Sequence, residues 1–175
     1  APNRLLAYVD NNSLSYEAIK SLRTNLMFGM PAQGRAGQRA KVILITGESP
    51  GVGKSFISSN LTEVFAQLDK KVLIIDADMR LGELHKMFSM SQDNGLGDYL
   101  SQDTTHLIKD NALVSKVVAD QDVNNLASFI HATGIDNIDF MPRGQHPRNP
   151  ASLLANGSFD HLMTELNLHY DYIII

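Results

Sequence analysis

Cysteine is absent from this chain of 175 residues. Without cysteine the chain can form neither a disulfide framework nor a thiolate zinc site, and this composition fits a reducing compartment. No apolar run approaches the roughly 20 residues that are needed to span a bilayer. The start of the chain does not resemble a signal peptide. Because no initiator methionine is present, we expect the chain to be an excerpt of a longer protein.

A large basic block is also missing. The formal net charge is −4, which argues against general nucleic-acid binding, so no nucleic-acid partner is expected. The six histidines are scattered without the spacing of metal ligands, and this favours surface or packing roles. Apolar residues make up 43% and charged residues 19%, an ordinary globular composition whose length suits one domain.

Apolar runs and helical spacings alternate along the chain. Continuous apolar runs predict buried strands at 41–46, 71–76 and 172–175, and a shorter strand at 138–141. Helical spacing predicts helices near 13–28, 54–68 and 159–166, with Ser158 as the cap of the last one. The segment 94–100 predicts a turn and a short helix. Asn149 as a cap and Pro150 at the first helical position predict the start of another helix at 149–154. The segment 101–137 gives no firm pattern, and 30–39 is expected to be flexible. Alternating strands and helices predict an α/β fold with a doubly wound, mainly parallel sheet flanked by helices.

A glycine-rich turn, GESPGVGKS at 47–55, separates the first strand from the helix that follows it. Gly51 and Gly53 can adopt backbone angles that are closed to other residues, and they let the backbone approach an anion closely. Their amides would point inward, and the helix N-terminus would add partial positive charge. This context of strand, glycine-rich turn and helix predicts a phosphate-binding loop, and hence a sheet of the P-loop NTPase type.

The last two side chains of this turn stand in the order that nucleotide chemistry requires. Lys54 would reach the β- and γ-phosphates, and the Ser55 hydroxyl would bind Mg²⁺. The strict pattern has a glycine six residues before the lysine, where this chain has Glu48. A bare glycine turn that merely caps the helix therefore stays as an alternative.

Two carboxylates follow the second predicted strand. Asp76 and Asp78 alternate along an extended segment, so both can face the same side. Ligands of open α/β sheets bind beyond the carboxyl ends of the strands. Beside a phosphate-binding loop, such carboxylates would hold metal-bound waters or accept a proton from an attacking hydroxyl. The alternative is that they cap the next helix or pair with Arg80.

Four stretches together resemble one family, the bacterial tyrosine kinases that form the cytoplasmic domains of exopolysaccharide co-polymerases. The turn at 47–55 has the proline-containing Walker A form of that family. The segment VLIIDADMR at 72–80 is similar to its Walker A′ motif, and FMPRGQHPRNPASLL at 140–154 is similar to its proline- and asparagine-containing stretch. The helix segment EAIKSLR at 17–23 is close to a charged helix motif of the family.

The resemblance implies an ATP-dependent protein-tyrosine autokinase that regulates exopolysaccharide synthesis and export. The γ-phosphate of ATP would pass to C-terminal tyrosines of neighbouring subunits, with Mg²⁺ present and ADP as product. The resemblance makes Lys54 the phosphate anchor and Asp76 the base for the tyrosine hydroxyl. It makes Ser55, Asp76 and Asp78 the residues around the metal. The nucleotide would be held by Pro50, Gly51, Val52, Gly53, Lys54, Ser55 and Phe56.

The charged helix motif departs from the family at one position. Glu17, Lys20 and Arg23 form a slanted stripe on one helix surface, and Lys20 stands where the family has arginine. The resemblance makes this stripe a contact with the next subunit of a ring, with an octamer as one candidate size. From the charge pattern alone, a solvated face with a Glu17–Lys20 pair is the more common arrangement.

The resemblance also predicts the setting of the chain. Residues 1–175 would form a single P-loop kinase domain, with a helix and flexible linker in 1–40 and the nucleotide-binding core in 41–175. The domain would be incomplete, because the family's third strand continues into a Walker B aspartate and its tyrosine cluster comes later. The implied partners are a membrane-spanning co-polymerase region, in the same chain or in another, and a cognate tyrosine phosphatase. The implied location is the cytoplasmic face of the bacterial inner membrane.

Two rival functions stay open from the sequence. A partitioning or cell-division ATPase would share the sheet and the nucleotide chemistry, but such proteins carry a second lysine early in the turn, where this chain has Ser49. A nucleotide-binding scaffold would control assembly without turnover. The scaffold predicts oligomers that ATP stabilises and no phosphotyrosine.

Overall fold

A five-stranded sheet in the order β1-β5-β2-β4-β3 lies at the centre of the computed structural model. The structure describes residues 4–30, 40–102, 126–155 and 157–175. All neighbouring strands run parallel except β3, which lies antiparallel to β4 at one edge. The strands are β1 (Lys41–Ile43), β2 (Val72–Ile75), β3 (His131–Ala132), β4 (Ile138–Met141) and β5 (Tyr172–Ile174).

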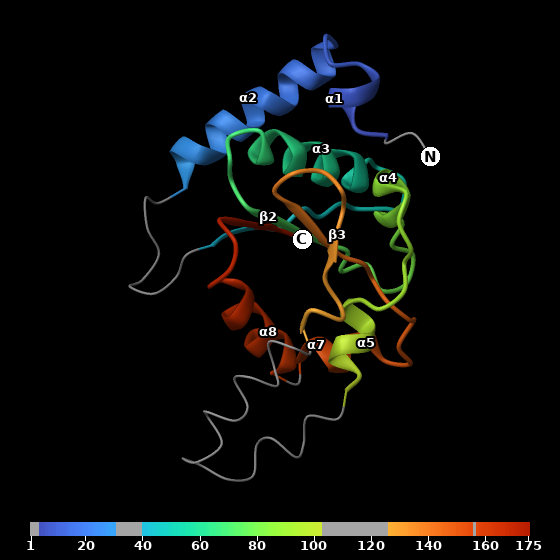
Figure 1. Ribbon diagram of the computed structural model, residues 1–175. Coiled ribbons are helices and arrows are strands. Elements are labelled where there is room, and N and C mark those ends of the chain that lie inside the picture. The colour runs from blue at the N-terminus through green and yellow to red at the C-terminus, as the bar shows by residue number, and fades with distance from the viewer. Residues whose placement is uncertain (1–3, 31–39, 103–125, 156) are drawn as a thin grey trace.

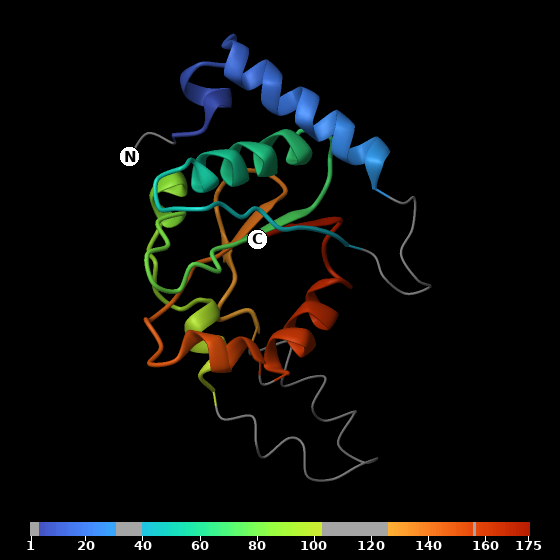
Figure 2. The same cartoon turned by 180° about the vertical axis from the view of Figure 1, so that it is seen from behind.

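Helices cover both faces of this sheet (Figures 1 and 2). One layer holds α1 (Leu6–Val9), α2 (Leu14–Gly29), α3 (Lys54–Ala66) and α4 (His85–Phe88). The other layer holds α5 (Leu96–Leu100), α7 (Pro150–Ala155) and α8 (Ser158–Leu166). A mostly parallel sheet between helices confirms the predicted α/β class.

Two hydrophobic cores arise because successive residues of β2 point to opposite faces. Val72 and Ile74 pack with Phe65 of α3 on one face. Leu73 and Ile75 pack with Leu162 of α8 on the other face. All four residues of β2 are fully buried, so the strand that leads to Asp76 is fixed from both sides.

The prediction of a buried strand over 41–46 is wrong in two respects. β1 ends at Ile43, and among the described strands it pairs only with β5, so it lies at an edge. Val42 is 44% exposed and Leu44 is 69% exposed. A continuous apolar run therefore marks a strand here but does not report how many neighbours it has.

Local signals misled at one further place. Ser158 was expected to cap α8, but it is the first helical residue, and Gly157 is the cap with a φ of 83°. The weakly patterned region 101–137 contains β3, which sequence analysis missed. Residues 31–39 of the segment expected to be flexible, and residues 103–125, lie outside the described ranges.

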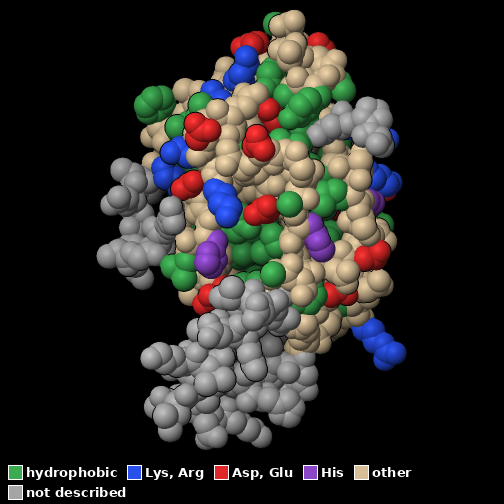
Figure 3. Space-filling view, in the orientation of Figure 1, with side chains coloured by type: hydrophobic (Ala, Val, Ile, Leu, Met, Phe, Trp, Pro, Cys, Tyr) green, Lys and Arg blue, Asp and Glu red, His purple; other side chains and the backbone are tan. Residues whose placement is uncertain are grey.

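Charged side chains of both signs are interspersed on the face drawn in Figure 3. Within the described ranges the ion pairs are Lys20–Glu17 on α2 and Lys86–Glu83 beside α4. No helix in that part of the chain is both long enough and apolar enough to cross a bilayer.

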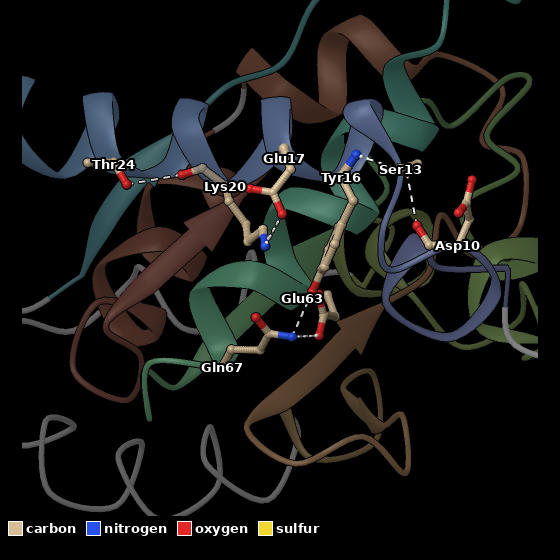
Figure 4. Close-up of polar contacts among 8 residues, drawn as sticks. All are labelled: Asp10, Ser13, Tyr16, Glu17, Lys20, Thr24, Glu63 and Gln67. Carbon is tan, nitrogen blue, oxygen red and sulfur yellow. Dashed lines mark hydrogen bonds and ion pairs between the residues drawn. The ribbon is translucent and has the colours of Figure 1, made fainter.

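A polar cluster around the buried Tyr16 and Glu63 side chains connects α2 to α3 (Figure 4). The Tyr16 hydroxyl donates to Glu63 Oε2 at 3.1 Å, and Gln67 Nε2 donates to both Tyr16 Oη and Glu63 Oε1 at 2.7 Å. Burial raises the pKa of the Glu63 carboxyl. Ser13 caps α2, since its hydroxyl accepts from the Tyr16 N–H at 3.1 Å. The N-terminal helix is therefore anchored to the helix that carries Lys54.

Tyr16→Phe tests this cluster. The change removes one donor to Glu63 and one acceptor for Gln67 while keeping the ring, so it should cost about 1–2 kcal/mol of unfolding free energy. Urea unfolding at pH 7 measures the cost. Tyr8→Phe is the matched control, because Tyr8 is 59% exposed and should lose nothing measurable. Equal effects of the two changes would show that the cluster does not stabilise the docked helix.

Candidate active site

The turn between β1 and α3 has the backbone that an anion-binding loop requires. Gly51 has a φ of 78° and Gly53 a φ of 99°, both in the left-handed region. A Cβ on either residue would meet no atom within 4 Å, so glycine is needed for its backbone angle and not for space. Alternating backbone angles of this kind turn successive N–H groups toward one point, which is how a phosphate nest forms.

The helix that follows adds to this concavity. Gly53 is the N-cap of α3 and offers no side chain to its first-turn N–H groups. These groups and the helix dipole favour an anion at this end. Lys54 Nζ lies over the turn and donates to the Ser49 carbonyl oxygen at 3.4 Å. An ammonium held this loosely is free to move to a stronger acceptor, such as a phosphate oxygen.

A cleft of about 700 Å³ joins this turn to the end of β2. It is lined by eight of the predicted residues, namely Pro50, Gly51, Gly53, Lys54, Ser55, Phe56, Asp76 and Asp78. Val52 is exposed and lies outside the lining. The structure thus brings the glycine-rich turn and both carboxylates to one cavity, although 20 residues separate them in sequence.

Asp76 is the buried acid of the cleft, with 3% of its surface exposed. Its Oδ1 accepts from the Asp78 N–H at 3.2 Å, and its Oδ2 accepts from the Leu84 N–H at 3.1 Å. Burial raises the pKa of this carboxyl to about 6, although the two N–H donors and the Arg143 charge act in the opposite direction. At pH 7 it is therefore mostly ionised yet binds a proton more tightly than an ordinary aspartate.

Asp78 is exposed and organises the next turn. Its Oδ1 accepts from the N–H groups of Arg80 and Leu81, at 3.3 and 3.0 Å. The capping alternative thus holds in part, since Asp78 closes a turn and Asp76 bonds the residue that precedes α4. The ion-pair alternative finds no support, because Arg80 pairs with neither carboxylate in the described structure.

The residues at the cleft fit magnesium and a nucleotide phosphate chain. Mg²⁺ prefers oxygen ligands and keeps several waters, so it needs only a few protein donors. Ser55, in the first turn of α3, and Asp76 and Asp78, after β2, supply oxygen atoms to this cleft. Within the described ranges no cluster of three or more His, Asp or Glu side chains offers a complete metal cage. This donor set therefore suits a metal that arrives with phosphates better than one held by protein alone.

The three residues of the charged stripe separate into two environments. Glu17 and Lys20 form an ion pair of 2.5 Å on α2, in which Glu17 is exposed and Lys20 is half-buried. Lys20 Nζ also lies 4.9 Å from the centroid of the Tyr16 ring. Arg23 turns inward, and its Nη1 donates to the Val64 carbonyl oxygen of α3 at 2.8 Å.

Sequence analysis missed several residues around the carboxylates. Gly82 and Glu83 line the cleft, and Gly82 packs directly against the Asp76 carboxylate. His146 Nδ1 lies 2.9 Å from the Met79 carbonyl oxygen, which ties the 142–149 loop to the segment after Asp78. No spacing signalled His146, because its partner is 67 residues away.

Comparisons with known proteins agree with this geometry. The model of a family described as an AAA domain matches residues 40–175. The chain belongs to the AAA domain family. This membership supports nucleotide binding at the glycine-rich turn, and the matched residues include the whole cleft.

Two of the similar proteins carry the name tyrosine-protein kinase. The chain is 38% identical over 174 residues to a putative tyrosine-protein kinase in the cps region of Klebsiella pneumoniae, covering 99% of this chain and 21% of that protein. It is 36% identical to the tyrosine-protein kinase wzc of Salmonella typhimurium, with the same 99% and 21% coverage. The chain thus spans about a fifth of the length of these relatives.

Solved structures agree in sequence and in fold. The kinase domain of the Escherichia coli tyrosine kinase ETK matches with a TM-score of 0.77 and 34% identity, covering 99% of this chain and 58% of that one. The BceF tyrosine kinase domain matches with a TM-score of 0.70 and 32% identity, covering 98% of this chain and 58% of that one. The predicted resemblance to bacterial tyrosine kinases is confirmed.

The raised pKa of Asp76 predicts how stability depends on pH. The folded protein binds this proton more tightly than the unfolded chain, whose aspartate has a pKa of 3.8. The resulting contribution to stability is complete below that value and is lost as pH rises through about 6. Asp76→Asn cannot titrate at this position. The free energy of unfolding of the wild type should therefore fall, relative to that of the variant, by up to about 3 kcal/mol between pH 4 and pH 8. Urea unfolding without nucleotide or Mg²⁺ measures the difference, and a difference independent of pH would contradict the burial of this carboxyl.

Proposed function

We propose that this chain is the nucleotide-binding part of a protein-tyrosine autokinase that regulates exopolysaccharide synthesis and export. One observation carries the proposal: the left-handed Gly51–Gly53 turn and the buried Asp76 carboxylate face the same cleft. An anion nest alone would suit many nucleotide-binding proteins. A carboxylate with a pKa of about 6 beside it adds a group able to take a proton from a hydroxyl.

Four side chains of the cleft have separate tasks in this reaction, those of Lys54, Ser55, Asp76 and Asp78. ATP binds with its phosphates on the nest, and Lys54 neutralises the β- and γ-phosphates. Ser55 and Asp78 would hold Mg²⁺ or its waters beside Asp76, and the metal would supply charge neutralisation. The oxygen of a tyrosine hydroxyl attacks the γ-phosphorus while Asp76 accepts the proton of that hydroxyl. The bond from that phosphorus to the bridging oxygen breaks, and ADP leaves. Positioning and charge provide most of the acceleration.

The wider setting is also proposed from the relatives. Residues 1–175 act as one P-loop kinase domain, with 1–40 as helix and linker and 41–175 as nucleotide-binding core. The domain works at the cytoplasmic face of the inner membrane, next to a membrane-spanning co-polymerase region, and a cognate tyrosine phosphatase reverses its product. Subunits assemble into a ring, with an octamer as one candidate size. The stripe of Glu17, Lys20 and Arg23 would contact the next subunit, chiefly through the solvent-accessible Glu17–Lys20 pair, because Arg23 donates to Val64 of its own chain.

A phosphotyrosine assay tests the reaction. The full natural polypeptide that carries this chain is incubated with Mg-ATP and probed for phosphotyrosine. Lys54→Met and Asp76→Asn should each lower the rate about a hundredfold or more, since each removes a charge that acts at the reacting phosphate or hydroxyl. Lys70→Met is the matched control, because Lys70 is absent from the cleft lining. ATP hydrolysis without phosphotyrosine would favour a partitioning-type ATPase. Oligomers that ATP stabilises, with neither product, would favour a scaffold.

Charge reversal on α2 tests the ring contact. Glu17→Lys replaces the ion pair with two like charges and should convert assemblies to smaller species in light scattering. Asp160→Lys makes the same reversal on α8, in the opposite helix layer, and should leave the mass unchanged. Assemblies of wild-type mass in the Glu17 variant would place the contact elsewhere.

A further inference from the structure

The segment after β2 folds back over the Asp76 carboxylate. Both of its oxygens accept backbone N–H groups, Oδ1 from Asp78 at 3.2 Å and Oδ2 from Leu84 at 3.1 Å. Between these donors, the Gly82 N–H donates to the Asp78 carbonyl oxygen at 2.7 Å and closes a tight turn. The carboxylate is thus held by main chain, and no cationic side chain of the described residues pairs with it.

Gly82 lies against this carboxylate with no room for a side chain. A Cβ at this position would lie 2.3 Å from Asp76 Oδ1 and 2.5 Å from Oδ2. It would also lie 2.5 Å from the Asp78 carbonyl oxygen. Gly82 is not among the glycines with a left-handed backbone, so the requirement here is space and not conformation.

Any side chain at residue 82 would therefore displace either the Asp76 carboxylate or the turn that covers it. One escape is rotation of the carboxylate, which would break its bonds from Asp78 and Leu84 inside a buried environment. The other is displacement of the turn, because the third contact is a backbone oxygen that cannot rotate away. Rotation shifts the Asp76 oxygens directly, and displacement of the turn moves the N–H groups that hold them.

We propose that Gly82 is a positioning residue for Asp76: the missing side chain lets the turn at 78–84 close onto the carboxylate and set its place opposite Lys54. The role rests on the proposed function, in which Asp76 takes the tyrosine proton. Met79 and Leu84 fix the two ends of the turn by burial in the two cores, and Gly82 lies between them. Leu81 is exposed, so apolar packing does not hold the turn closed at that point. His146 ties down the turn only at the Met79 carbonyl, before Gly82.

Steady-state kinetics of Gly82→Ala test the positioning role in the full natural polypeptide. The rate constant kcat for phosphotyrosine formation should fall about 10- to 100-fold, because a displacement near 1 Å has that effect on a positioned group. The KM for ATP should stay within about twofold, since the nest and Lys54 are untouched. Gly29→Ala is the matched control, because a Cβ at that helical position would meet no atom within 4 Å. An unchanged kcat, or a KM that rises as far as kcat falls, would overturn the proposal.

A double-mutant cycle tests the same contact without any assay of activity. Gly82→Ala should lower the urea unfolding midpoint of the wild type. In an Asp76→Ala background the decrease in the midpoint should be half or less of the decrease in the wild type. The two contacts with the Asp76 oxygens are then absent, and only the contact with the Asp78 carbonyl oxygen remains. Equal drops would overturn the proposal. If Gly82→Ala alone does not fold, folding of the double variant supports the contact, and failure of both overturns it. If the wild type forms no phosphotyrosine, the proposed function is wrong, but the unfolding midpoints still show whether Gly82 contacts Asp76.

Discussion

The structure of the site depends on a short piece of backbone, the left-handed turn at Gly51 and Gly53. A left-handed backbone is unfavourable for every residue with a Cβ, and glycine adopts it without that penalty. The turn directs N–H groups toward one point at the start of α3, where the helix leaves further N–H groups unpaired. An anion bound here would satisfy donors that no side chain in the described structure caps. Phosphate recognition therefore follows from main-chain geometry, and Lys54 adds the charge.

Packing then decides where the opposing carboxylate lies. β2 is fully buried between the two cores, and Asp76 follows directly after its last residue. Burial is what raises the pKa of Asp76, and it also restricts the carboxylate to partners from its own segment. The α3 helix is held just as firmly, since Phe65 stacks on Tyr172 with ring centroids 4.0 Å apart. Nest and acid thus belong to elements that share one core, which is a requirement for catalysis by positioning.

Much of this could be predicted from sequence because the signals are local. The turn at 47–55, the run at 72–75 and the two aspartates each carry their own pattern of residue types. The misses have two causes, a choice between neighbouring residues and contacts between segments that are far apart in sequence. The exposure of β1 depends on how many strands flank it, and the capping of α8 depends on a backbone angle at Gly157 that the favourable Ser158 concealed. Gly82 and His146 gained their roles only from partners that the fold brings to them, and spacing rules cannot show such contacts.

The proposed reaction requires that the Gly51–Gly53 turn binds the phosphates of a nucleotide. Calorimetric titration of the full natural polypeptide with ADP and Mg²⁺ tests it most directly, with Gly53→Val as the variant. Valine cannot adopt a φ of 99° without strain, so the nest should open. The account predicts saturable binding at one site in the wild type and affinity at least about tenfold weaker in the variant. No heat of binding in the wild type, or equal affinity in both proteins, would contradict it.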